Sequence, residues 1–189
     1  SGIFLVKSFQ RLVYRWRNAN PGVEPKAEVL RRLLERNIVG VDIEPHAVRT
    51  AVFSLYLALC DEIDPKQYWK SVRFPLLRGE SLIANDFFSE ATDEALAQME
   101  ATKFDLVVGN APWGKNTLTQ HGQEWAARNH WPTPYGKLGP LFTPPSVSLC
   151  GLSGLVALPQ QSAPSFGPTK NFVNVHNTPI PHVTVHNSN

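Results

Sequence analysis

The fold is decided by an apolar run and the polar residues that follow it, FDLVVGNAPW at residues 104–113. The apolar, β-branched residues of 104–109 predict a short strand that is buried in a sheet. Pro112 restrains the residue before it to an extended conformation, which fixes the direction of the Ala111 carbonyl. The stretch therefore predicts a strand that delivers Asn110, Ala111, Pro112 and Trp113 to its carboxyl end.

A second strand is expected upstream, at residues 38–42, where Ile-Val-Gly-Val-Asp is short and apolar. Asp42 ends this strand, and Ile43-Glu44-Pro45 then opens a helix with proline near its first turn. Because ligands of parallel sheets lie beyond the carboxyl ends of the strands, both Asp42 and Asn110 fall where a ligand would bind.

The remaining elements follow from hydrophobic periodicity. Amphipathic helices are expected at residues 4–16 and 29–37, and an acidic surface helix at 90–100. Further strands are expected at 74–77 and 152–158. Strands that alternate with helices predict an α/β fold with a mostly parallel sheet.

Composition sets limits on the class of protein. The chain has 189 residues and a formal net charge of +2, enough for one domain and too balanced to argue nucleic-acid binding from charge. The basic series Lys7, Arg11, Arg15 and Arg17 is interpreted as a solvated helix face without a DNA contact. Two distant cysteines exclude a disulfide framework and favour a reducing compartment, so a cytoplasmic protein is expected. No apolar run is long enough for a membrane span, and residues 1–6 do not resemble a signal peptide.

The character of the chain changes beyond Pro140. Lys170 is the one charged side chain after that point, and proline, asparagine and serine are frequent. We therefore expect no second half of an α/β domain there, and a low-complexity, disordered tail at residues 160–189. No metal site is predicted, because His176, His182 and His186 lie in this tail without cysteine or acidic neighbours.

The Asn-x-Pro-aromatic pattern suits one kind of chemistry. An exocyclic amine conjugated with a ring is a poor nucleophile, and two hydrogen-bond acceptors aimed at its protons favour a more tetrahedral nitrogen. The Asn110 side chain and the Ala111 carbonyl are such acceptors, and Trp113 is a platform on which a base can stack. The pattern therefore indicates transfer of a group to an aromatic amine.

Residues 107–114 resemble the Asn-Pro-Pro-aromatic motif of the adenine-specific DNA methyltransferases of restriction-modification systems, with alanine at Ala111 where that family has proline. Residues 39–45 resemble the family segment whose acidic residue binds the cofactor ribose, and Asp42 is the matching position. Residues 79–82 resemble the segment near the cofactor adenine. Glu80 is the preferred match in that segment, and Asp86 is the competing one. Residues 1–6 resemble the end of the first cofactor loop, so the strand before that loop is expected to be missing.

The resemblance implies a Rossmann-like methyltransferase fold over residues 1–159, incomplete at its N-terminus, that uses S-adenosyl-L-methionine. It implies that a flipped-out adenine in DNA is held by Asn110, Ala111, Pro112 and Trp113, and that a specificity domain or subunit accompanies the catalytic part. Two alternatives stay open: methylation of a protein glutamine or an RNA base, and an inactive remnant. The residues that the resemblance assigns to the cofactor are Ser1, Gly2, Asp42, Ile43, Glu80 and Ser81.

Overall fold

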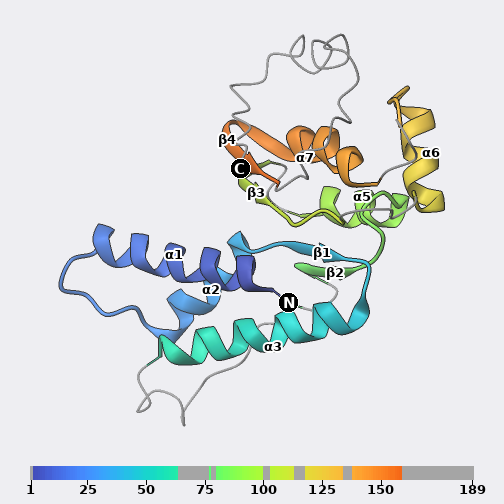
Figure 1. The fold of residues 1–189 in the computed structure, drawn as a ribbon. Helices are drawn as coiled ribbons and strands as arrows, with labels where there is room; N and C mark the ends of the chain where they lie inside the picture. Colours follow the sequence, from blue (N-terminus) through green and yellow to red (C-terminus); the bar gives the residue numbers. More distant parts are fainter. Residues whose placement is uncertain are drawn as a thin grey trace, which may run out of the picture. The chain divides into compact units, whose positions relative to one another are not determined.

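The computed structural model describes residues 2–63, 77, 80–99, 103–112, 118–133 and 138–158 (Figure 1). The chain forms two compact units, Ser1–Glu100 and Ala101–Asn189. Within the residues described, each unit contains helices and one pair of parallel strands. The mixed helix and strand content and the parallel pairing agree with the predicted α/β class.

The first unit contains a parallel pair of three-residue strands and three long helices. The strands β1 (Gly40–Asp42) and β2 (Leu82–Ala84) pair so that Gly40 is opposite Leu82 and Asp42 is opposite Ala84. The carboxyl ends of both strands therefore lie at the same edge. The helices, in chain order, are α1 (Ile3–Ala19), α2 (Ala27–Asn37), α3 (Pro45–Asp61) and the shorter α5 (Glu90–Ala97).

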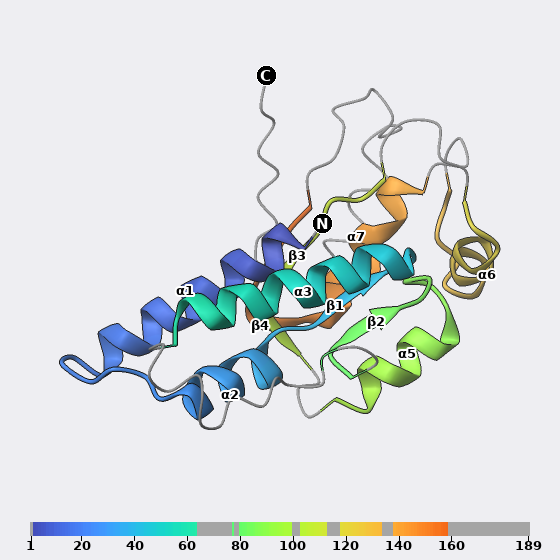
Figure 2. The same ribbon diagram turned by 90° about the horizontal axis from the view of Figure 1, so that it is seen from below.

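The core of this unit lies between the three long helices and the strand pair. Helix α1 packs against both α2 and α3, and Figure 2 shows α1 and α3 side by side. Phe9, Leu30 and Leu55, one from each helix, are fully buried. Burial of side chains of this size contributes roughly 1.5–3 kcal/mol each. A Cβ at Gly40 would lie 2.9 Å from Leu82 Cδ2 and 3.0 Å from Leu5 Cδ1, so glycine allows this close approach.

Most predicted elements of the first unit are confirmed. Helix α3 begins at Pro45 as predicted, and Ser89 caps α5 by accepting a hydrogen bond from the Thr92 N–H. The predicted strand at 38–42 begins only at Gly40, because the Ile38 N–H still donates to the Leu34 carbonyl at the end of α2. Strand β2 was not predicted. Of the strand predicted at 74–77 only Leu77 lies within the described residues, where it is buried but not in a strand.

The second unit is built on the parallel pair β3 (Phe104–Val108) and β4 (Cys150–Ala157). In the sequence, three of the described helices separate these strands: α6 (Gln120–Arg128), the 3-10 helix η2 (Gly139–Phe142) and α7 (Thr143–Leu149). Helix α7 packs against both strands. The register shifts within the pair, since Phe104 is opposite Cys150 whereas Leu106 is opposite Leu155. The extra residues of β4 form an irregular segment that ends at Gly154.

Two features of this unit differ from the prediction. Beyond Pro140 the sequence predicted only the strand at 152–158, which β4 confirms, whereas the helix α7 before it was not predicted. Two prolines occupy the first turn of α7, where proline suits a helix because its missing N–H needs no partner there. Strand β3 was expected to be buried, but Leu106 and its register partner Leu155 are 47% and 60% exposed. No described element of this unit covers that side of the pair. The tail at 160–189 lies outside the described residues.

Candidate functional site

Asp42 is presented at the carboxyl edge of the β1–β2 pair. Its Oδ1 accepts a hydrogen bond from the Glu44 N–H at 2.9 Å, which turns the chain toward α3. Its backbone carbonyl accepts one from the Asn85 N–H at 3.1 Å, which ties the ends of the two strands together. The side chain is exposed, and no hydrogen bond within the described residues engages Oδ2. The carboxylate is thus held by one oxygen and can accept hydrogen bonds from hydroxyl groups through the other.

Ile43 lies next to this carboxylate and is 56% exposed. Its neighbour in sequence, Glu44, is also exposed and precedes the first residue of α3. An exposed isoleucine beside a carboxylate offers apolar surface and a hydrogen-bond acceptor at one point. A nucleoside is complementary to this pair, because its flat ring can contact the apolar surface and its hydroxyl groups can donate to the carboxylate.

The structure does not bring Glu80 to this edge. Glu80 is an exposed turn residue that precedes β2, so it lies at the amino end of that strand, while Asp42 lies at the carboxyl end of β1. Ser81, the next residue, is buried, and its carbonyl accepts a hydrogen bond from the Gly40 N–H at 2.9 Å, which helps to hold β1 and β2 together. Asp86, the competing candidate, follows the carboxyl end of β2. The parallel register therefore brings Asp42 and Asp86 to one edge and leaves Glu80 at the other.

Asp86 is fixed by a compact hydrogen-bond network at the start of α5. Its Oδ1 accepts from the Phe88 N–H at 2.9 Å, and its backbone carbonyl accepts from the Thr92 hydroxyl at 2.7 Å and the Ser89 hydroxyl at 2.9 Å. The residue is 7% exposed. The second carboxylate oxygen, Oδ2, has no hydrogen bond within the described residues. Every enclosed side-chain polar atom among these residues has a hydrogen bond, so Oδ2 is not enclosed and retains access to the surface. Asp86 therefore presents one acceptor in a fixed direction.

Gly2 precedes the first residue of α1 and requires glycine for two reasons. Its φ of 79° lies in the left-handed region, and a Cβ would lie 2.8 Å from Ala51 Cβ and 2.9 Å from Ala51 Cα. The start of α1 thus rests directly on α3. Gly2 carries no side-chain acceptor for the N–H groups of the first turn, so these groups and the helix dipole favour an anion before the helix. Ser1 lies outside the described residues.

In the second unit, Asn110 leaves the end of the β3–β4 pair. The Gly109 N–H donates to the Ala157 carbonyl at 3.2 Å, so the strand pairing continues to the residue before Asn110. Asn110 is exposed, while Ala111 is buried. A Cβ at Gly139 would lie 3.0 Å from the Pro112 carbonyl oxygen, so η2 packs closely against this segment. The motif is therefore anchored on both sides of an exposed asparagine. Trp113 lies outside the described residues.

Two tryptophans of the second unit lie in or near α6. Trp125 lies in α6, which the sequence did not predict, and Trp131 follows its end. Within the described residues no group of three His, Cys, Asp or Glu side chains is arranged to hold a metal ion. None of the described helices combines the length and the hydropathy that crossing a membrane requires. The sequence did not predict a role for Gly139, because its contact with the Pro112 carbonyl joins two segments that are distant in the chain.

Comparison with known proteins adds one finding. The family model of the Eco57I restriction-modification methylases matches residues 36–157. Neither the curated proteins nor the solved structures yielded a match. The matched range contains both parallel strand pairs, the two aspartates at the edge of β1–β2, and Asn110 at the end of β3. Because the match covers more than half of the chain, this protein belongs to the Eco57I restriction-modification methylase family.

Proposed function

We propose that this chain carries the cofactor-binding and catalytic part of an enzyme that transfers a methyl group from S-adenosyl-L-methionine to the exocyclic amine of adenine in DNA, on a Rossmann-like fold. The observation that carries the proposal is the position of Asn110-Ala111-Pro112 immediately beyond the β3–β4 parallel pair. Restriction-modification methylases act on DNA, so membership of the family supports DNA as the substrate.

The residues at the edge of β1–β2 fit the cofactor. The exposed oxygen of Asp42 would accept hydrogen bonds from the ribose hydroxyls, and Ile43 beside it would contact the nucleoside. Asp86, rather than Glu80, would accept a hydrogen bond from the adenine amine of the cofactor, because Asp86 lies at the same edge as Asp42. The glycine at the start of α1 suits a carboxylate near the helix N-terminus. When bound, the cofactor supplies an electrophilic methyl group on a sulfonium.

Asn110 and Ala111 would act on the acceptor base. The Asn110 side-chain oxygen accepts one hydrogen bond from the amine, and the Ala111 carbonyl accepts the second. These bonds strengthen as the nitrogen becomes tetrahedral, so they lower the barrier rather than only bind the substrate. Trp113 would stack on the base after it leaves the helix. Related motifs have proline at this position, which makes the backbone rigid. Here the burial of Ala111 would hold its carbonyl in position instead.

The alternatives from the sequence have less support. Methylation of a protein glutamine or an RNA base uses similar acceptor motifs, but the family match is to methylases of restriction-modification systems. An inactive remnant was suggested partly by the alanine at position 111. The structure buries this alanine, which favours a working motif.

The test compares variants of the full chain in a methyl-transfer assay. The chain is incubated with S-adenosyl-L-methionine and unmethylated genomic DNA, and the nucleosides are analysed by mass spectrometry. We expect N6-methyladenine. Asn110→Ala should lower turnover by roughly 100- to 1000-fold while the cofactor Kd, measured by calorimetry, stays unchanged. Asp42→Ala should instead raise the cofactor Kd.

A matched control is Asn129→Ala, which removes an exposed asparagine from the end of α6 in the same unit. It should leave turnover within a few-fold of the parent. Methylcytosine in place of methyladenine would refute the adenine assignment. A parent chain that binds no cofactor and methylates no DNA would refute the proposal as a whole.

A further inference from the structure

Basic side chains line the exposed face of α1. Lys7, Arg11 and Arg15 follow one another at four-residue spacing and are all exposed. The helix contains no acidic residue. From the sequence this series, together with Arg17, was interpreted as a solvated helix face.

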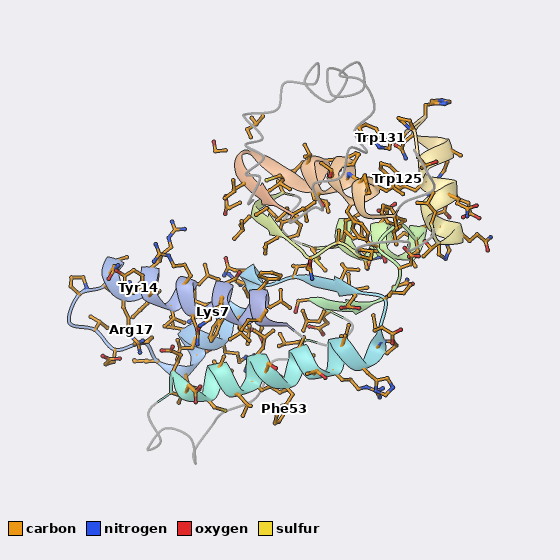
Figure 3. The ribbon with its side chains drawn as sticks, viewed as in Figure 1. Lys7, Tyr14, Arg17, Phe53, Trp125 and Trp131 are labelled. Carbon is orange, nitrogen blue, oxygen red and sulfur yellow. The ribbon has the colours of Figure 1, made fainter. Side chains whose placement is uncertain are left out.

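The structure separates Arg17 from the other three. Its guanidinium donates to Glu62 Oε2 at 2.7 Å and lies 3.5 Å from Glu24 Oε2. It therefore joins the end of α1 to the following turn and to the end of α3, and Figure 3 shows it near the far end of α1 from Lys7. Within the described residues, Lys7, Arg11 and Arg15 form no ion pair.

A solvated helix face does not account for this pattern. Solvated helices usually alternate charges, as α2 does with the ion pair between Arg31 and Glu35 at 2.9 Å. Like charges at four-residue spacing destabilise a helix by roughly 0.2–0.5 kcal/mol per pair. The series from Lys7 to Arg15 contains two such pairs. A binding partner with negative charge would convert this cost into affinity.

Neighbouring side chains hold two of the three basic groups in place. The Arg11 guanidinium lies over the Tyr14 ring, 5.0 Å from its centroid, and Tyr14 is itself exposed. The Lys7 ammonium donates to Gln10 Oε1 at 3.1 Å. These contacts lower the entropy that the side chains lose on binding.

We propose that this face, formed by Lys7, Arg11 and Arg15, binds the phosphate backbone of duplex DNA, at a surface separate from the target-base motif. The inference rests on the proposed function in that the substrate is DNA. Eight residues of α-helix span about 12 Å, at about 1.5 Å per residue. Phosphates follow one another at about 3.4 Å of helix axis on each strand, so the three cations match several successive phosphates in charge and reach.

The test measures binding of a fluorescein-labelled DNA duplex of random sequence by anisotropy, over a series of salt concentrations and without cofactor. In the test variant the three cations of α1 are neutralised: Lys7→Gln, Arg11→Gln and Arg15→Gln. Its affinity should fall about tenfold or more at low salt. The slope of log K against log salt should become shallower by about 2 to 3, since each phosphate contact contributes about 0.9.

A control variant removes the same charge from another exposed surface of the same unit. The control substitutions are Lys26→Gln, Arg32→Gln and Arg36→Gln, at and after the start of α2. This variant should keep both the affinity and the salt slope of the parent. Circular dichroism of both variants establishes that the helices remain folded.

The outcomes separate this inference from the proposed function. If the α1 variant binds DNA with the parent's affinity and slope, or if the parent binds no DNA, the inference is overturned. Loss of binding to vesicles of phosphatidylserine and phosphatidylcholine, with DNA binding unchanged, would overturn it in favour of a lipid surface. DNA binding that depends on α1 in a chain that methylates no base would support the inference and refute only the proposed methyl transfer.

Discussion

Replacement of Gly2 by alanine should destabilise the first unit by two separable effects. The first is backbone strain, because alanine at a φ of 79° costs roughly 1–2 kcal/mol. The second is steric, because the new methyl group would lie 2.8 Å from Ala51 Cβ and 2.9 Å from Ala51 Cα. Backbone atoms of α3 cannot move aside as a flexible side chain can, and such overpacking costs about 1–3 kcal/mol. We expect a total loss of about 2–5 kcal/mol for Gly2→Ala.

Gly22 provides the control that isolates the strain. Its φ is 76°, but a Cβ there would meet no atom within 4 Å, so Gly22→Ala should cost only about 1–2 kcal/mol. Urea unfolding followed by circular dichroism measures both variants against the parent. The difference between them reports the packing of the start of α1 against α3. Equal destabilisation by the two substitutions would show that the first turn of α1 does not rest on α3.

Two further glycine effects are expected in the second unit. Gly154→Ala should destabilise it by about 1–3 kcal/mol in urea unfolding, because a Cβ would lie 2.5 Å from Cys150 Sγ and 2.7 Å from the Phe104 carbonyl oxygen. Gly151→Ala is the control, because a Cβ there would meet no atom closer than 3.7 Å. An equal loss of stability in both variants would contradict the described register. His130 has a φ of 51° just after α6, so His130→Gly should stabilise the unit by about 0.5–1 kcal/mol. His130→Ala should bring no gain, and a gain as large as that of glycine would show that backbone strain is not the cause.

The elements with a strong local signal were predictable from the sequence. The helices α1, α2 and α3 each present a buried stripe, and Pro45 marks the start of α3. The apolar run that ends before Asn110 gave β3. These elements place Asp42 and Asn110 at strand ends as predicted.

What escaped prediction depended on pairing between distant segments. Strand β2 has three residues, too few for a periodic pattern, and only its register with β1 defines it. Without β2 there was no means to decide which of Glu80 and Asp86 lies at the edge of Asp42. Helix α7 was hidden by its two prolines, and the shift between Phe104 and Leu106 depends on how closely Gly154 approaches the β3 backbone.

The hydrogen-bond network of Asp86 has a consequence for how this family can change over evolution. One carboxylate oxygen and the backbone carbonyl hold the start of α5, while the second oxygen is the one that we propose binds the cofactor. Selection for folding therefore acts on this position even in a lineage that has lost its cofactor. An aspartate retained here in an inactive descendant is no evidence of activity, whereas Asp42, whose exposed side chain makes one hydrogen bond, to the Glu44 N–H, is under weaker structural constraint once the cofactor is lost.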